Sequence, residues 1–196
     1  MRILGLDLSL RSTGYVLLED DQVVWHGVIG SDTLREAERL QMFDKWIRDT
    51  LANRNSVYWT HHPPTDAPRP AYTPLDHVAI EGYSYGQPQA HTRAFGVGEL
   101  GGVIKLAIYQ IGIPIHVIAT NTWKMVVCGK GGLDKRNASV EISKRYGVEF
   151  AKEDTLDAWA VAMCLRRQLL GLDKPEPKVR RRKSVPLLES IVAGNE

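Results

Sequence analysis

Residues 2–29 read RILGLDLSLRSTGYVLLEDDQVVWHGVI, and the predicted sheet begins with them. It holds three apolar segments, at 2–8, 14–18 and 22–29, with turn-forming residues between them. Short segments of this kind predict three consecutive strands in an antiparallel meander. Asp7 interrupts the first segment, although an ionised carboxylate is costly in an apolar setting unless it is paired or binds a metal. The stretch therefore predicts a sheet and, at its first strand, a polar site.

Helical and strand-like segments alternate after the meander and complete the predicted domain. Gly147 and Gly171 each follow a predicted helix, as glycine commonly does at a helix C-terminus. We expect one α/β domain over residues 1–171, built on a five-stranded mixed sheet flanked by helices. The further elements are helices at 33–53, 89–111, 135–146 and 154–170, strands at 77–80 and 113–119, and a loop at 120–134 with one helical turn around Trp123.

Two segments are predicted to lie outside the regular elements. Five of the ten prolines fall between Pro63 and Pro74, and proline at this density excludes a regular helix or a central strand. His61 and His62 lie beside them without a third ligand at suitable spacing, which favours a surface loop over a metal site. Residues 172–196 contain a run of Lys and Arg and are predicted to form a flexible basic tail.

Composition and hydropathy indicate an ordinary globular protein. No apolar run reaches the roughly 18 residues that a membrane-spanning helix needs. The N-terminal residues lack the order of regions that marks a secretory signal. Cys128 and Cys164 show neither metal-ligand nor redox spacing. We therefore expect a cytoplasmic protein with reduced thiols and no membrane partner.

Three further carboxylates resemble Asp7 in their apolar surroundings. Glu81 ends an apolar run, and Asp154 and Asp157 open a segment with helical spacing whose shared face must meet the sheet. No basic residue adjoins any of the four acids in sequence, so a shared metal site explains them together. A helix-dipole role would account for Asp154 and Asp157 but would leave Asp7 unexplained.

Ligands that are all oxygen suit Mg²⁺ or Mn²⁺. Two such ions roughly 3.5–4 Å apart can activate a water and stabilise the leaving oxygen in phosphodiester hydrolysis. We therefore predict two Mg²⁺ ions per active site, replaceable by Mn²⁺. The predicted ligands, which are also the predicted catalytic acids, are Asp7, Glu81, Asp154 and Asp157.

Basic residues are concentrated in the tail and in one glycine-containing stretch, although the formal net charge is only +2. Local basic patches can bind phosphates even when the whole molecule is near neutral. Lys124 or Lys135 can also stabilise charge on a pentavalent phosphate, and the alternative is a solvated basic loop. The basic residues of the glycine-containing stretch are Lys124, Lys130, Lys135 and Arg136.

Several motifs occur in a fixed order between residues 2 and 170. They are Ile3-Leu4-Gly5-Leu6-Asp7, Ser12-Thr13-Gly14-Tyr15, Val78-Ala79-Ile80-Glu81, the pair Lys124 and Lys135 around Val126-Val127-Cys128-Gly129, and Asp154-Thr155-Leu156-Asp157-Ala158. Together they resemble the RuvC family of Holliday-junction resolvases. One departure is Leu8-Ser9, which stands where that family commonly has proline-glycine.

The resemblance implies an RNase H-like fold, a homodimer, and Mg²⁺-dependent cleavage of four-way DNA junctions. It gives catalytic roles to the four acids and to Lys124 and Lys135. It also implies an aromatic residue after the second acid, Tyr83 or Tyr85, that stacks on an unpaired base. Packing at the strand end is the alternative for these tyrosines. The helix at 89–111 would form the dimer interface or pack within one subunit.

The leading hypothesis is therefore an endonuclease that resolves four-way (Holliday) DNA junctions by paired symmetric nicks, with Lys130 and Arg136 among its DNA contacts. An alternative is a nuclease for branched DNA in general, including flaps and forks. An actin-like nucleotide-binding protein would need two such domains, and this chain has the length of one. A binding module without catalysis gains nothing from four convergent acids. The compact size fits a phage-encoded resolvase acting in the host cytoplasm.

Overall fold

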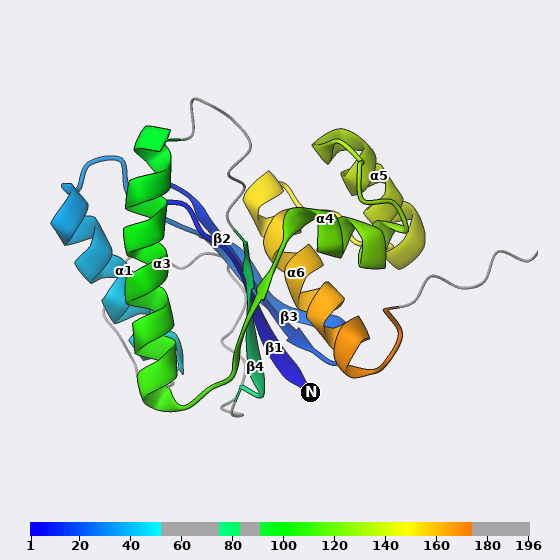
Figure 1. Ribbon diagram of the computed structural model, residues 1–196, viewed down its shortest axis with the longest axis horizontal. Coiled ribbons are helices and arrows are strands. Elements are labelled where there is room, and N and C mark those ends of the chain that lie inside the picture. The colour runs from blue at the N-terminus through cyan, green and yellow to red at the C-terminus, as the bar shows by residue number, and fades with distance from the viewer. Residues whose placement is uncertain (52–74, 83–90, 174–196) are drawn as a thin grey trace, which may run out of the picture.

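The computed structural model describes residues 1–51, 75–82 and 91–173 of the chain. The strands are β1 (Arg2–Asp7), β2 (Thr13–Glu19), β3 (Gln22–Ile29), β4 (His77–Glu81) and β5 (Ile115–Ile118). They form one sheet in the order β3-β2-β1-β4-β5, which Figure 1 shows at the centre of the molecule. The β1–β2 and β2–β3 pairs are antiparallel, whereas β1–β4 and β4–β5 are parallel. The predicted five-stranded mixed sheet is confirmed.

Helices cover both faces of this sheet. The described helices are α1 (Glu36–Leu51), α3 (His91–Ile111), α4 (Thr120–Trp123), α5 (Lys135–Tyr146) and α6 (Glu153–Leu169), with a π-helix, η2, at Lys124–Cys128. Figure 1 shows α1 and α3 together on one face and α4, α5 and α6 on the other. Among the described residues, no helix has the length and apolar character needed to cross a bilayer.

α6 lies directly on β1 and β2 because two glycines leave room for its backbone. A Cβ atom at Gly5 would overlap the carbonyl oxygen of Ala158, and one at Gly14 would overlap the carbonyl oxygen of Asp154. Backbone atoms cannot move aside as the end of a flexible side chain can. The two glycines therefore bring the first turns of α6 to the end of β1, where Asp7 lies.

A second apolar core fixes the sheet from the other face. Tyr15 of β2 packs against Trp25 of β3 and Trp46 of α1, with ring centroids 4.3 Å and 5.4 Å apart. Leu100 and Ile104 of α3 are fully buried in the same cluster. Because both faces of the sheet are covered, the strand ends are held in fixed positions relative to the helices.

The segment predicted as a loop at 120–134 contains α4, which agrees with the helical turn predicted around Trp123, and also η2, which was not predicted. The backbone N–H groups of Thr122 and Trp123 both donate to the carbonyl of Ala119 and start α4, and η2 follows without a break. Elements of four and five residues are too short to show the apolar periodicity that predicts a helix. η2 ends at Cys128, and the next residue, Gly129, has a φ of +77° that glycine adopts without strain.

Some predicted features lie outside the described residues. The proline-rich segment with His61 and His62 falls between 52 and 74, and the predicted basic tail lies outside from residue 174 onward. The division of the chain into a domain at 1–171 and a tail at 172–196 therefore stays a prediction.

Gly5→Ala is expected to lower the free energy of unfolding by about 1–3 kcal/mol, the usual cost of forcing extra volume into a packed core. Gly132→Ala is the matched control, because a Cβ atom at Gly132 meets nothing within 4 Å. Urea unfolding followed by circular dichroism measures both. Equal stability of the two variants would contradict the close contact between α6 and β1.

Candidate active site

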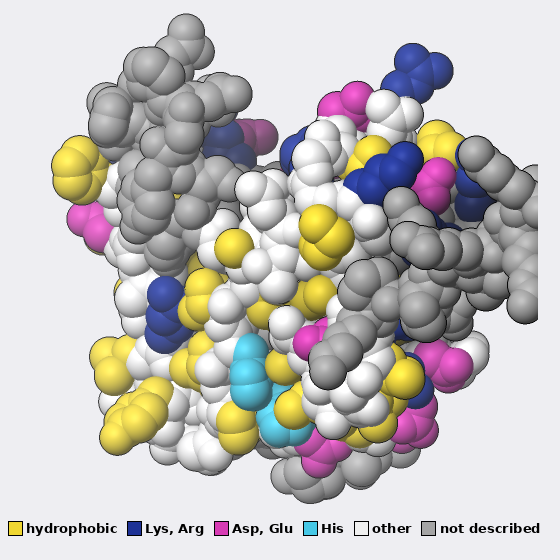
Figure 2. All heavy atoms as spheres, turned by 45° about the vertical axis from the view of Figure 1, so that its right-hand side comes forward, with side chains coloured by type: hydrophobic (Ala, Val, Ile, Leu, Met, Phe, Trp, Pro, Cys, Tyr) yellow, Lys and Arg dark blue, Asp and Glu magenta, His cyan; other side chains and the backbone are white. Residues whose placement is uncertain are grey.

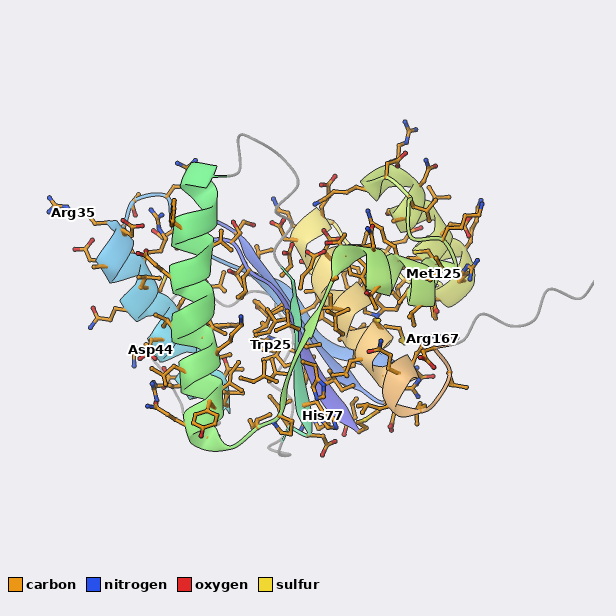
Figure 3. The ribbon with its side chains drawn as sticks, in the orientation of Figure 1. Trp25, Arg35, Asp44, His77, Met125 and Arg167 are labelled. Atoms are coloured by element: carbon orange, nitrogen blue, oxygen red, sulfur yellow. The ribbon has the colours of Figure 1, made fainter. Side chains whose placement is uncertain are left out.

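Three carboxylates from three elements meet at one end of the sheet. Asp7 ends β1, Glu81 ends β4, and Asp157 lies near the start of α6. One carboxylate oxygen from each lies within 4.8 Å of the others. β1 and β4 are parallel neighbours, so their last residues lie side by side. His77, labelled in Figure 3, begins β4 and marks the opposite end of the strand from this cluster.

Burial and like charge favour the protonated form of two of these acids. Burial, the charge of Glu81 and a hydrogen bond with Glu81 raise the pKa of Asp7 from 3.8 to about 9. Burial and the charge of Glu81 also raise the pKa of Asp157 to about 6, although Lys135 acts in the opposite direction. A positive charge nearby would favour the ionised form of both Asp7 and Asp157.

The acidic cluster fits a hard divalent cation. Its donors are carboxylate oxygens alone, which suit Mg²⁺ and Mn²⁺ rather than a metal that prefers nitrogen or sulfur. A bound cation would also offset the burial and the like charge that raise the pKa of Asp7, because it favours the ionised form of each ligand. Of the four predicted ligands, the structure brings Asp7, Glu81 and Asp157 into this group.

Asp154, the fourth predicted ligand, lies beside the cluster and outside the group of three. The hydroxyl of Ser12 donates a hydrogen bond to Asp154 Oδ2. Burial and the charge of Glu81 are the main causes of the raised pKa of Asp7, and the charge of Asp154 adds a smaller contribution. Its role as a metal ligand stays a prediction, and its hydrogen bond to Ser12 was not anticipated from the sequence.

The side chain of Glu81 is held from the side of α4. Thr120 Oγ1 donates to Glu81 Oε1 at 2.8 Å, and Trp123 Nε1 donates to the same oxygen at 2.9 Å. Sequence reasoning missed both residues. A signal did exist, because a buried indole N–H needs an acceptor and a tryptophan in a polar stretch suggests one nearby. The sequence does not reveal which acceptor it finds.

Both predicted catalytic lysines lie near the cluster. Lys135 Nζ is 3.1 Å from Asp157 Oδ2. Burial alone would lower the pKa of Lys135, but the charges of Asp157 and Asp7 outweigh burial and the pKa is raised. Lys124 Nζ donates to the carbonyl of Leu133 at 2.6 Å. Its charge partly offsets the rise in the pKa of Asp157 that burial and the charge of Glu81 cause. Lys135 thus neutralises part of the charge of the cluster by pairing with Asp157, whereas Lys124 is bonded to a backbone carbonyl.

The remaining residues predicted to contact DNA are two basic residues and two tyrosines. Lys130 and Arg136 are exposed, one after η2 and the other in the first turn of α5. Both are therefore accessible to a large ligand. Tyr83 and Tyr85 lie outside the described residues, so the stacking role stays a prediction.

Comparison with known sequences identifies relatives that span most of this chain. A scan against models of known protein families finds no match. The crossover junction endodeoxyribonuclease RuvC of Acidiphilium cryptum is 31% identical over 169 residues, which cover 83% of this chain and 89% of the relative. The RuvC of Rhodococcus opacus is 25% identical over 166 residues, which cover 84% of this chain and 80% of the relative.

Solved structures show the same fold at lower identity. Thermus thermophilus RuvC matches with a TM-score of 0.64 and 16% identity over 87% of this chain and 97% of that one. The T. thermophilus RuvC in complex with Holliday junction substrate matches with a TM-score of 0.66 and 18% identity, over 88% and 97%. The yeast mitochondrial Holliday junction resolvase Ydc2 matches with a TM-score of 0.53 and 14% identity, over 87% and 80%.

The predicted RNase H-like fold is therefore confirmed. With the acidic cluster and the RuvC relatives, this fold defines an endonuclease. The 31% identity to the A. cryptum relative, over 89% of that protein, identifies the family within this class. The chain belongs to the RuvC family of crossover junction endodeoxyribonucleases. The family and enzyme class predicted from the sequence are confirmed.

The stability of the metal-free protein is expected to fall as pH rises from about 4 to about 9. The folded-state pKa values of Asp157 and Asp7, about 6 and about 9, exceed the ordinary value of 3.8. In this window the folded protein binds more protons than the unfolded chain, so ionisation favours unfolding. Asp7→Asn should remove most of the fall above pH 6 and gain about 1 kcal/mol or more at pH 8.

Urea unfolding in chelator-containing buffer, repeated at several pH values, measures this effect. Asp21→Asn, a change at an exposed acid in the β2–β3 turn, is the control and should retain the wild-type slope. A wild-type protein that is as stable at pH 8 as at pH 5 would contradict the electrostatic strain at the cluster.

Proposed function

We propose that this protein resolves four-way DNA junctions by metal-dependent hydrolysis of phosphodiester bonds, in paired symmetric nicks. The observation that carries the proposal is the cluster of Asp7, Glu81 and Asp157 at the strand ends of a RuvC-family chain. The T. thermophilus RuvC in complex with Holliday junction substrate supports the choice of DNA. A DNA substrate also fits the expected cytoplasmic location.

We propose Mg²⁺ as the cofactor, with Mn²⁺ able to replace it and two ions per active site. Asp7, Glu81 and Asp157 would hold the metal, and Asp154 would join them by exchanging its hydrogen bond to Ser12. Divalent ions in such a site supply Lewis-acid stabilisation of the phosphate and lower the pKa of a water nucleophile. The chain itself supplies an acidic site fixed between two strands and a helix.

The two lysines have different proposed roles. Lys135 is more than half exposed and paired with Asp157, so its ammonium group can turn from the carboxylate to a phosphate oxygen that arrives at the cluster. In that position it would stabilise the extra negative charge of the pentavalent phosphate. Lys124 is bonded to the carbonyl of Leu133, which holds it and the loop after η2 in place.

A basic surface beside the cluster is the proposed path for the DNA backbone. Figure 2 shows Lys and Arg side chains over the part of the molecule where α5 lies, at the upper right. The basic residues of η2, α5 and their connection are Lys124, Lys130, Lys135, Arg136, Lys144 and Arg145. Binding through phosphates releases counterions, so we expect the affinity to fall steeply with salt.

One face of α3 is the proposed homodimer interface. Phe95 and Tyr109 are 77% and 76% exposed, and Leu106 lies on the same face. Gly98 and Gly102 lie between them, and a Cβ atom at either would meet nothing within 4 Å. Such a face lets a second helix approach closely, with aromatic side chains on both sides of the contact. A twofold dimer would present two acidic clusters to one junction, which explains paired nicking.

Asp7→Asn should abolish cleavage of a four-way junction in Mg²⁺, and Lys135→Met should slow it by about 100-fold, the usual loss for one transition-state donor. Asp21→Asn should cleave at the wild-type rate. Gel assays on four-way junction, flap and plain duplex measure the rates and separate a resolvase from a general branched-DNA nuclease. Wild-type cleavage by Asp7→Asn would overturn the metal assignment.

Phe95→Glu and Tyr109→Glu should each convert the dimer to a monomer, because they place charge in an apolar contact. Val140→Glu is the control, since Val140 is an exposed apolar residue on α5, away from α3. Light scattering after gel filtration gives the mass, and circular dichroism checks the fold. A monomeric wild-type protein, or a variant that stays dimeric, would exclude this face.

A further inference from the structure

The two hydrogen bonds to Glu81 arise from the way β5 ends. Glu81 and Ile118 are paired across the parallel β4–β5 ladder, and the N–H of Gly82 donates to the carbonyl of Ile118. The chain then turns into α4, so Thr120 starts that helix two residues beyond the partner of Glu81. Its hydroxyl lies 2.8 Å from Glu81 Oε1 because of this register.

Trp123 approaches Glu81 from the apolar side. It ends α4 immediately before η2 and is only 1% exposed. Its indole N–H can only donate, so burial would leave it unsatisfied without an acceptor. In this position it finds Glu81 Oε1 at 2.9 Å. Met125, labelled in Figure 3, lies two residues further on, in η2.

Both donors act on the same oxygen, and this decides what the carboxylate can do. A carboxylate oxygen has two lone pairs, and two donors at 2.8 Å and 2.9 Å use both on Oε1. We infer that Thr120 and Trp123 are positioning residues that fix the Glu81 carboxylate and leave Oε2 as its metal ligand. This inference rests on the metal site of the proposed function.

The arrangement differs from simple core packing. A packing role for Trp123 would be served by any large apolar side chain, and one for Thr120 by valine of nearly the same shape. Partners that orient metal-binding carboxylates typically contribute 10–100-fold in metal affinity. Loss of either donor should therefore weaken cation binding at Glu81 while the fold is retained.

A first experiment tests the contact without metal. In ¹H–¹⁵N spectra of the metal-free protein, the Trp123 indole resonance is the one that Trp123→Phe removes. Glu81→Gln should shift it towards a weaker hydrogen bond, because an amide oxygen replaces a charged acceptor. Thr122→Val, which changes an exposed threonine in the same helix, should leave it in place. A resonance that does not move in Glu81→Gln would overturn the inference, whatever the protein binds.

A second experiment measures the consequence for the cation. Mn²⁺ binding followed by electron paramagnetic resonance should weaken about 10-fold in Thr120→Val and in Trp123→Phe. Thr120→Ser, which keeps the hydroxyl, and Thr122→Val should bind as the wild type does. In junction cleavage, Thr120→Val should need about 10-fold more Mg²⁺ for half-maximal rate and reach a similar rate at saturation. A structural defect would instead lower the rate at every Mg²⁺ concentration.

Asp7→Asn separates the two levels of the proposal. If it abolishes Mn²⁺ binding while Thr120→Val and Trp123→Phe bind normally, the positioning role is overturned and the proposed metal site stands. If Asp7→Asn binds Mn²⁺ as the wild type does, the metal site itself is wrong. Weaker binding in both donor variants, with rescue by Thr120→Ser, supports both.

Discussion

The structure depends on the contact between the backbone of α6 and the two strands beneath it. Gly5 and Gly14 are the points where a side chain would overlap carbonyl oxygens of that helix. Because α6 lies so close, Asp157 is 5% exposed and still within reach of Asp7 and Glu81. A helix held even slightly further from the sheet would separate the carboxylates. Packing at two glycines therefore sets the geometry of the acidic cluster.

Without a cation, ionising the acids of the cluster is unfavourable, and neighbouring groups stabilise two of them. Burial and like charge raise the pKa of Asp7 to about 9. The supporting groups act on different acids: Lys135 pairs with Asp157, whereas Thr120 and Trp123 bond to Glu81. None of these three groups donates to Asp7, and its pKa is raised further than that of Asp157. A bound metal would therefore stabilise Asp7 most, because this acid is held in place by β1 and not by a hydrogen-bond donor.

Sequence reasoning succeeded where a local pattern carries the information. The strands follow from short apolar segments between turns, and the acids were found because charge interrupts such segments at Asp7 and Glu81. Sequence reasoning failed for features that depend on contacts between residues distant in the sequence. The helical character of residues 124–128 leaves no periodic signal. Neither the pairing of Lys135 with Asp157 nor the donors to Glu81 can be inferred from spacing.

The three acids lie at positions 7, 81 and 157, so the cluster takes residues from both the first strand and the last described helix. During synthesis the N-terminal part of a chain emerges first, and contacts between distant residues form late. A ribosome-bound chain that has not yet released α6 lacks Asp157 as well as the helix that covers Gly5. A copy that ends before α6 would lack one of the three carboxylates, so the acidic cluster is incomplete until translation reaches that helix.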